Sequence, residues 1–196
     1  MRIACASANP HKVSEIARLL PPDVVLLARP DEVGEVAETA PTLEGNAVIK
    51  AVEIANHVGT WALADDTGLE VEALGGEPGV RSARFAGEPP DDRANRALLL
   101  QRLDGQQNRR ARFRTVVALV HPSGEIHLLH GECAGSITTV ERGGNGFGYD
   151  AVFVPDDGDG RTFAEMEPSE KDAMSHRGRA LARLPGLVAR VSGRTV

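Results

Sequence analysis

Long apolar runs, excess positive charge and cysteine are all scarce in this sequence. No apolar run approaches the ~20 residues that a bilayer-spanning helix needs, and the first eight residues, MRIACASA, are too short for the core of a signal peptide. Apolar residues nevertheless make up 41% of the 196 residues, which is enough for a packed core in a chain of this length. We therefore expect a cytoplasmic protein that does not bind membranes.

The two cysteines and the net charge narrow the class of protein further. Cys5 and Cys133 lie in apolar, strand-like runs, which favours buried, reduced thiols. Lysine and arginine number 22 against 28 aspartates and glutamates, so the formal net charge is -6. A general nucleic-acid-binding protein is usually basic, and that class is therefore disfavoured. A small anionic substrate in a local cationic pocket is not excluded.

The first third of the chain predicts alternating strands and helices. Short apolar runs predict strands at residues 2–7, 24–28 and 61–64. A helix with apolar residues at helical spacing follows Asn9 and is ended by Pro21-Pro22. A longer helix runs from a Thr42 cap to Gly59. This β-α-β-α-β order predicts an α/β fold, a mixed sheet with helices around it.

The second half of the chain adds a helix, a hairpin and a helical segment. The helix begins at Asp91 or Asp92 and runs to about Leu103. Apolar runs flank the turn sequence HPSGE, which predicts a β-hairpin and a second lobe. The expected elements are strands at 113–120, 126–140 and 151–155, then helical patterning at 167–184 that Pro185-Gly186 interrupts. We expect residues 1–196 to form a single domain of two lobes.

The segment SANPHK joins the first expected strand to the first helix; it comprises Ser7, Ala8, Asn9, Pro10, His11 and Lys12. Asn9 is suited to cap this helix, and Pro10 is suited to its first turn. Free amides and the helix dipole at such a start attract phosphate, and Lys12 adds a positive charge. The segment has neither a Walker nor a Rossmann spacing. An ordinary capped helix start is the alternative.

A polar stripe runs along one face of the second expected helix. Asn46, Lys50, Glu53 and His57 fall at positions i, i+4, i+7 and i+11, and Glu38 precedes the helix. A solvated helix face is the alternative interpretation. Taken alone, Glu38 identifies no site.

Asp65 and Asp66 follow four residues, WALA, that are typical of a buried strand. Burying one unpaired carboxylate is costly, and two neighbouring ones repel, so a cation is expected beside them. If the strand continues this far, the two side chains point to opposite sides; one then contacts a metal while the other holds the backbone or surrounding groups. Hard carboxylate oxygens suit Mg²⁺. The alternative is a turn, because Asp-Asp-Thr-Gly has turn composition.

Two further segments carry chemistry: GFGYD at residues 146–150 and EKDAMSHRGRAL at residues 170–181. Ser175 is a typical N-cap, which puts His176 and Arg177 in a first helical turn. The helix dipole disfavours cations there by ~0.3–1 kcal/mol each, so an anion or electron-rich ligand beside them is expected. Phe147 and Tyr149 offer rings on which a base could stack. Alternatively, Phe147 is a core residue and Tyr149 a turn residue.

Together and in this order, these segments resemble the inosine triphosphate pyrophosphatase family, the nonstandard purine nucleoside triphosphate pyrophosphatases. The resemblance extends from Ile3 to about Leu184, and its most specific pieces are ADDTGLEVEALGG-PGVRSAR, GFGYD-VF and SHRGRAL. It implies an elongated two-lobed α/β fold with a central substrate cleft, usually in a homodimer. It also implies Mg²⁺-dependent hydrolysis of ITP, dITP and XTP to the monophosphate and pyrophosphate, which removes them from the nucleotide pool.

The resemblance assigns roles to individual residues. Asp66 is implied to be the catalytic base and a metal ligand, and Glu38 a metal or water ligand. The triphosphate is implied to bind Lys50, Thr67 and the segment from Ser7 to Lys12. The base and the remaining phosphate are implied to bind Phe147, Gly148, Tyr149, Asp150, Lys171, His176 and Arg177. Donors such as His176 and Arg177 would favour a 6-oxo purine over adenine.

Two positions depart from the family pattern. Ser7-Ala8-Asn9 stands where Thr-Gly-Asn is common, so Ala8 loses access to positive φ. Gly45 stands where an acidic residue is frequent, leaving Glu44 as the nearby carboxylate.

Two other functions stay open. A nucleotide-binding regulatory module without turnover would use the same contacts but would not need Asp66 and Glu38. The second alternative is a related pyrophosphatase specific for pyrimidine or modified nucleotides. A substrate panel separates it from a pyrophosphatase for nonstandard purines.

Overall fold

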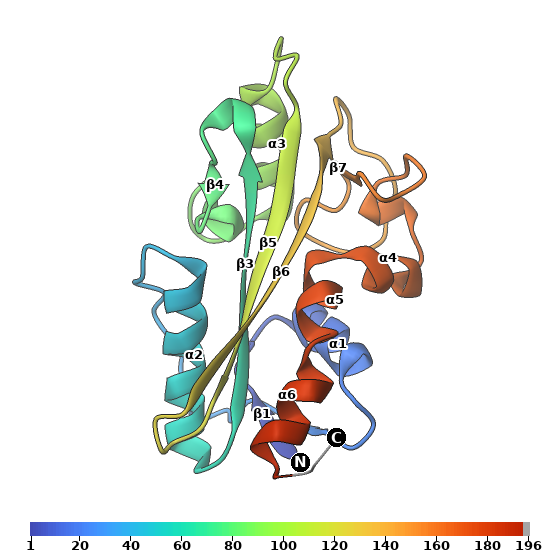
Figure 1. Ribbon diagram of the computed structural model, residues 1–196. Helices are drawn as coiled ribbons and strands as arrows, with labels where there is room; N and C mark the ends of the chain where they lie inside the picture. Colours follow the sequence, from blue (N-terminus) through green and yellow to red (C-terminus); the bar gives the residue numbers. More distant parts are fainter. Residues whose placement is uncertain (194–196) are drawn as a thin grey trace. The chain divides into compact units, whose positions relative to one another are not determined.

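The computed structural model describes residues 1–193 and shows a sheet with helices around it (Figure 1). The strands are β1 (Arg2–Cys5), β2 (Val25–Leu27), β3 (Ala62–Val71), β4 (Pro78–Gly79), β5 (Arg110–Val120), β6 (Ile126–Ile137) and β7 (Phe153–Pro155). The α-helices are α1 (Pro10–Leu19), α2 (Leu43–Val58), α3 (Asp92–Arg102), α4 (Pro168–Met174), α5 (His176–Leu181) and α6 (Leu184–Val191). None of the helices within residues 1–193 is both long and apolar enough to cross a bilayer.

The seven strands form one mixed sheet. Their order is β2-β1-β3-β5-β6-β7, and β4 pairs with β3 off this path. Strand β1 is parallel to both β2 and β3, whereas the β3–β4 and β6–β7 pairs are antiparallel. The α/β class and the mixed sheet predicted from the order of elements are therefore confirmed.

Local capping signals place the first two helices where the sequence predicts them. The Asn9 side chain accepts hydrogen bonds from the amides of His11 and Lys12, and Pro10 occupies the first turn of α1. Helix α2 follows Thr42, whose hydroxyl accepts from the amide of Gly45. It ends at Gly59, which has a φ of 66°, a left-handed conformation that glycine adopts without steric cost.

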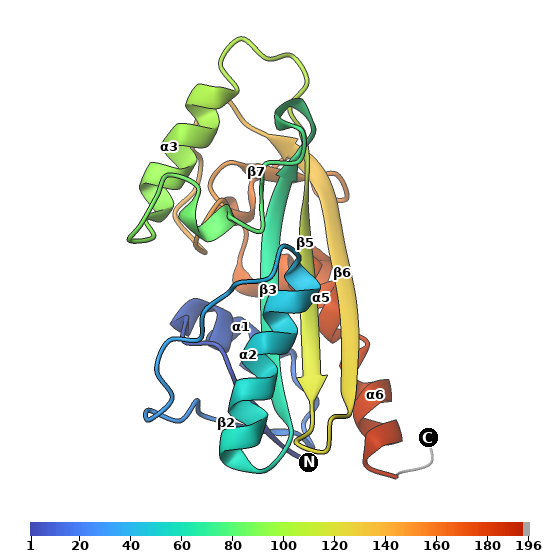
Figure 2. The ribbon, with the colours of Figure 1, turned by 90° about the vertical axis from the view of Figure 1, so that its left-hand side faces the viewer.

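The chain folds into two compact units. Unit 1 comprises residues 1–66, residues 115–131 and the chain from Arg177 onward; unit 2 comprises residues 67–114 and 132–176. In unit 1, α2 lies on one face of the strands, and α1, α5 and α6 lie on the other (Figures 1 and 2). Ile3, Ile16, Leu63, Leu181 and Leu187 are among the buried residues of the core between these strands and α1, α5 and α6.

The core of unit 2 is aromatic. Phe113 of β5 and Phe153 of β7 meet edge to face with ring centroids 4.7 Å apart, and Phe163 packs against both. Leu99 of α3 and Leu103, the residue that follows the helix, belong to the same core. This packing fixes α3 within unit 2, next to the glycine-rich segment that precedes β7.

Two expectations from the sequence are wrong in detail. The strand predicted at 61–64 continues to Val71, so Asp65 and Asp66 lie in a strand and not in a turn. The helical patterning at 167–184 belongs to separate helices, because Ser175 between α4 and α5 has an extended backbone with φ -69° and ψ 158°. Pro185 lies in the first turn of α6, where a proline is tolerated, and does not interrupt a helix.

Candidate active site

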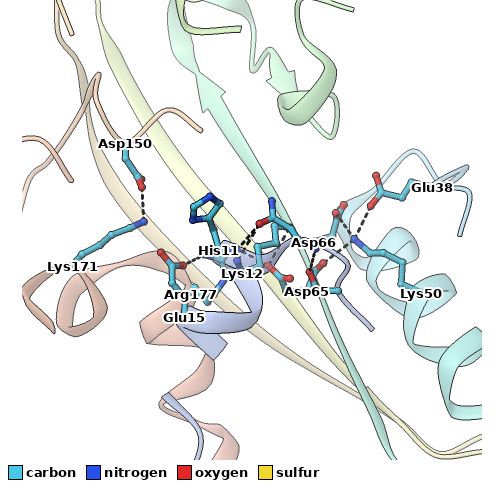
Figure 3. Close-up of polar contacts among 12 residues, drawn as sticks. His11, Lys12, Glu15, Glu38, Lys50, Asp65, Asp66, Asp150, Lys171 and Arg177 are labelled. Carbon is cyan, nitrogen blue, oxygen red and sulfur yellow. Dashed lines mark hydrogen bonds and ion pairs between the residues drawn. The ribbon is translucent and has the colours of Figure 1, made fainter. Parts of the chain in front are cut away.

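Asp65 and Asp66 are both buried in β3, with 2% and 6% of their surface exposed. Successive side chains of a strand point to opposite faces, and the two carboxylates accordingly contact different cations in unit 1 (Figure 3). The conditional expectation that a continuing strand would separate the two side chains is confirmed.

The Asp65 carboxylate lies in a cluster with a lysine and an arginine. Its Oδ2 is 3.3 Å from Lys12 Nζ and accepts hydrogen bonds from Arg177 Nη2 at 2.8 Å and Nε at 3.2 Å. Arg177 Nη1 also donates to a carboxylate oxygen of Glu15, which is buried on α1. Arg177 is 1% exposed, so its guanidinium is held between two carboxylates inside unit 1.

The Asp66 carboxylate lies in a second cluster, centred on Lys50 of α2. Lys50 Nζ donates to Glu38 Oε1 at 2.7 Å, to Asp66 Oδ1 at 2.9 Å and to the backbone oxygen of Asp65 at 2.8 Å. Figure 3 shows Lys50 reaching from α2 toward both carboxylates. Glu38, Lys50 and Asp66, to which the family resemblance assigns separate roles, thus lie together in unit 1.

Asn46 of α2 completes this second cluster. Its Nδ2 donates to Asp66 Oδ2 at 3.4 Å, and its Oδ1 accepts from the amide of Ala40 at 2.9 Å. Asn46 is 2% exposed. It therefore links the loop that carries Glu38 to the carboxylate of Asp66.

The two aspartates have pKa values shifted in opposite directions. Burial works against ionisation of Asp65, but the charges of Lys12, Arg177 and Lys50 outweigh it and hold the pKa of Asp65 well below its usual range. For Asp66, burial is the largest influence and raises the pKa above its ordinary value, although Lys50 and Lys12 oppose the shift. Opposed shifts in neighbouring carboxylates are a mark of divided chemical roles.

The lysines are shifted by the same forces. Burial lowers the pKa of Lys12, and Asp65 offsets only part of that effect. Burial acts on Lys50 as well, but the charges of Asp66, Asp65 and Glu38 exceed it and raise the pKa of Lys50. Lys50 is thereby kept as a cation between its carboxylates.

The Glu38 and Asp66 carboxylates suit a divalent cation. Within residues 1–193 no group of three or more His, Cys, Asp or Glu side chains is arranged to hold a metal ion. Mg²⁺ commonly binds one or two carboxylates and completes its shell with waters and substrate phosphates. Two hard carboxylates that share the single ammonium of Lys50 carry one negative charge in excess, which fits such a shared site.

The segment before α1 is the candidate phosphate-binding element. Ser7 Oγ accepts from the Asn9 amide at 3.2 Å, and Asn9 Oδ1 caps the amides of His11 and Lys12. Ala8, Asn9, Pro10 and His11 are exposed, whereas the Lys12 side chain is 18% exposed. Ala8 has a negative φ, since every residue with positive φ in the described chain is a glycine.

In unit 2, Asp150 organises the GFGYD segment. Its Oδ2 accepts from the Phe147 amide at 2.9 Å and from Lys171 Nζ at 2.6 Å. The same ammonium lies 5.0 Å from the centroid of the Phe147 ring. A cavity of about 140 Å³ adjoins this segment and is lined by Phe147, Gly148 and Asp150 among others.

The other predicted residues of unit 2 are buried or half-buried. The Tyr149 hydroxyl donates to the backbone oxygen of Ser82 at 2.8 Å, and burial is the main cause that raises its pKa. The His176 ring stacks on Phe113 with centroids 4.5 Å apart. Thr67 lies in β3 and is half-buried. Tyr149 is thus a core residue rather than an exposed platform.

Two buried residues of unit 1 were missed as site residues by sequence reasoning. Glu15 binds Arg177 and lies at i+3 from Lys12, so a shared helix face was the available signal. Asn46 binds Asp66 and lies at i-4 from Lys50, on the stripe that had also been open to a solvated interpretation. Asn46 and the Lys50 side chain are largely buried, whereas Glu53 and His57, further along the stripe, are exposed.

The glycine at position 45 has a packing cause. A Cβ atom at Gly45 would lie 2.5 Å from the Cβ of Ala40, so the Glu38 loop and α2 are too close here for a side chain. Glu44 contacts His130 at 3.6 Å.

Comparisons with known proteins place this chain in a family. The sequence matches the Ham1 family over residues 3–186. It is 46% identical over 197 residues to a dITP/XTP pyrophosphatase of Desulforamulus reducens, covering 97% of each chain, and 48% identical over 192 residues to one of Mycobacteroides abscessus, covering 94% of this chain and 93% of the relative. A solved structure of a HAM1 protein from Coxiella burnetii superimposes with a TM-score of 0.88 at 37% identity, covering 97% of this chain and 99% of that one.

The chain therefore belongs to the Ham1 family. The resemblance inferred from the sequence motifs is confirmed.

Proposed function

We propose that this protein hydrolyses the nonstandard purine nucleoside triphosphates dITP, XTP and ITP to the monophosphate and pyrophosphate. Relatives named dITP/XTP pyrophosphatase align over nearly the whole chain. The single observation that carries the proposal is Lys50 Nζ between the carboxylates of Glu38 and Asp66. A module that only bound nucleotides would have no need of this acidic pair, of which Asp66 is buried.

The triphosphate is proposed to bind the segment from Ser7 to Lys12, together with Lys50 and Thr67. Amides at the start of α1 and the helix dipole favour an anion. Lys12 and Lys50 are partly exposed cations that can meet phosphate oxygens. Such cations, with Lys171, stabilise the negative charge that develops as the pyrophosphate leaves.

Asp66 is proposed as the general base. A water oxygen attacks the α-phosphorus, the bond from that phosphorus to the bridging oxygen of the β-phosphate breaks, and pyrophosphate departs. Asp66 orients this water and takes its proton. A raised pKa suits this task, because the strength of a base increases as its pKa approaches the working pH. No covalent intermediate with the protein is required.

Glu38 and Asp66 would hold Mg²⁺. When bound, such an ion screens phosphate charge and lowers the pKa of a coordinated water. Lys50 contacts both carboxylates and holds them in place before any ligand arrives.

The base is proposed to bind residues 147–150 with Lys171, His176 and Arg177. Phe147 supplies a ring beside a cavity of about 140 Å³, and donors directed at a 6-oxo group would leave a partner unsatisfied with adenine. We further propose that residues 1–196 act as one pyrophosphatase domain, that it works as a homodimer, and that it resides in the cytoplasm, where nucleoside triphosphates are used.

The decisive experiment is a substrate panel. We expect Mg²⁺-dependent release of pyrophosphate and monophosphate from dITP, XTP and ITP at much higher kcat/KM than from ATP, dUTP or dTTP. Binding without turnover would instead identify a regulatory module. Preference for dUTP or dTTP would identify a pyrimidine pyrophosphatase. Sedimentation at micromolar concentration tests the dimer, since a species near 21 kDa, the mass of one 20.8 kDa chain, would contradict it.

A further inference from the structure

Two residues of α3 bind the backbone of Gly148, one at its amide and one at its carbonyl. Asp92 Oδ2 accepts from the Gly148 amide at 2.7 Å, and Arg96 Nη1 donates to the Gly148 carbonyl at 2.8 Å. Asp92 and Arg96 are four residues apart, so they share one face of α3. All three residues belong to unit 2, and neither α3 residue was a candidate from the sequence.

Arg96 also reaches the start of the same glycine-rich segment. Its Nε lies 3.0 Å from a carboxylate oxygen of Glu141, and its side chain is 17% exposed. The planar guanidinium can bind two acceptors in a fixed geometry, which a lysine cannot do. One side chain thus ties residue 141 and residue 148 together.

The segment between these two points needs such external contacts. Gly143, Gly146 and Gly148 have positive φ values of 82°, 74° and 58°. Glycines lose more conformational freedom on ordering than other residues and bring no side chain to pack. The two hydrogen bonds to Gly148 therefore fix a backbone conformation for which a glycine has little intrinsic preference.

The fixed peptide lies between residues proposed to contact the base. Phe147 precedes it, and its amide is bound by Asp150; Tyr149 follows it, and its hydroxyl is bound by Ser82. Arg96, Glu141, Phe147, Gly148 and Asp150 line the same cavity of about 140 Å³. A rotation of the Gly148 peptide would change the shape of this cavity and the placement of the Phe147 ring.

We propose that Asp92 and Arg96 are positioning residues that set the geometry of the base-binding segment through Gly148. The inference rests on the proposed function, because it assigns these residues to base recognition rather than to phosphate chemistry. Their loss should weaken binding of the nucleoside part of the substrate and leave the response to phosphate groups unchanged.

The test compares Asp92→Ala, Asp92→Asn and Arg93→Gln in the full chain. Asn keeps an oxygen that can accept from the Gly148 amide, and Arg93 is an exposed neighbour on α3. We expect Asp92→Ala to raise KM for dITP roughly 10-fold or more, the lower end of what one hydrogen bond to a charged group contributes, with kcat within about 2-fold of wild type. Asp92→Asn should recover most of the loss, and Arg93→Gln should behave as wild type.

Inorganic tripolyphosphate serves as the probe that lacks a base. Its inhibition constant should be the same in wild type and Asp92→Ala. Arg96→Lys should show an intermediate KM, because a single ammonium lacks the two separate nitrogens, Nη1 and Nε, that contact Gly148 and Glu141. A KM for dITP that stays at the wild-type value in Asp92→Ala, or an equal rise of KM and of the tripolyphosphate constant, would overturn the proposal.

A measurement on the unsubstituted protein covers the case in which a variant does not fold. Hydrogen exchange of the Gly148 amide should be slowed at least about 10-fold relative to an unstructured peptide, because this amide donates a hydrogen bond to Asp92. Exchange at the unstructured rate would overturn the proposal. If wild type turns over no triphosphate, the proposed function fails, whereas the exchange result still decides whether the contact between Asp92 and Gly148 exists.

Discussion

Asp65 and Asp66 are consecutive in β3, yet their carboxylates belong to separate ion-pair clusters. Asp65 Oδ2 lies 2.8 Å from Arg177 Nη2, and Asp66 Oδ1 lies 2.9 Å from Lys50 Nζ. Burial and nearby charge move their pKa values in opposite directions. One carboxylate thereby remains a fixed anion within the core of unit 1, and the other is suited to exchange a proton.

Asp66→Asn should remove most turnover without unfolding the protein. The amide cannot accept the proton of the attacking water, and general-base assistance is worth ~10²–10⁴-fold, while Lys50 keeps Glu38 as a partner. The measurement is kcat with dITP beside the melting temperature. Asp65→Asn is the matched variant, and we expect it chiefly to lower the melting temperature because Arg177 and Lys12 lose their shared anion. Near-normal kcat in Asp66→Asn would refute its role as base.

Lys50→Met should weaken the use of every triphosphate to a similar extent. Loss of a charged hydrogen-bond donor costs ~1.5–3 kcal/mol, so kcat/KM for dITP, XTP and GTP should fall together by about 10- to 150-fold. Lys50→Arg, which keeps the charge, is the control and should lose less. A strong change in the ratio of dITP to GTP, with triphosphate affinity unchanged, would show that Lys50 does not act on the phosphates.

Arg177→Ala should be strongly destabilising. Its guanidinium is buried against Asp65 and Glu15, and removing one partner of a buried ion pair costs ~3–5 kcal/mol because uncompensated charge remains. Urea unfolding measures the loss, and adding Glu15→Gln should recover part of it. A loss below about 1 kcal/mol would contradict this account.

The same variant tests the role in base selection that the sequence motif predicts. If Arg177 reads the base, kcat/KM should fall more for ITP and XTP than for ATP. An equal fall for all of these substrates would leave Arg177 with a structural or phosphate-binding role, and would shift base selection to residues 147–150.

Glu170→Gln should make the free energy of unfolding less dependent on pH in the acid range. Two hydrogen bonds from Arg161, then one from the Glu167 amide, lower the pKa of Glu170 to about 2 in the folded protein, against ~4.3 unfolded. Because the folded pKa is the lower one, this stabilisation is full above the unfolded pKa and is lost as the pH falls toward 2.

Urea unfolding between pH 6 and pH 2.5 measures this effect. The gap in unfolding free energy between wild type and Glu170→Gln should shrink steadily toward the acid end. Arg161→Gln should remove the same pH-dependent contribution. A gap that is constant with pH would contradict the prediction.

Features encoded over a few residues were predictable from the sequence. Thr42 and Gly59 mark the ends of α2, and Asn9 with Pro10 starts α1, because caps act within one helical turn. The roles of Glu38, Asp66 and Lys50 were assigned through a family resemblance and not through spacing. Local signals and motifs therefore gave the α/β class and the acidic pair.

Contacts between distant residues were not predictable in this way. Arg177 bonds Asp65 across 112 positions and Glu15 across 162, and no local pattern encodes such partners. The extension of β3 through two aspartates was hidden because Asp-Asp-Thr-Gly has turn composition, and the cations that stabilise it come from α1, α2 and α5. The hydrogen bonds that join Gly148 to Asp92 and Arg96 of α3 were also missed, because the partners lie 56 and 52 positions apart.

The close approach of Ala40 and Gly45 constrains which residues these two positions can carry together. A Cβ at position 45 would lie 2.5 Å from the Ala40 Cβ, so a side chain there requires Ala40 or the loop backbone to shift. Relatives with an acidic residue at the position of Gly45 should carry a compensating glycine at the position of Ala40, or a loop of different length between Glu38 and α2. Substitutions at these two sites should therefore be inherited as a pair, and the reach of the Glu38 carboxylate toward Lys50 should differ between the two lineages.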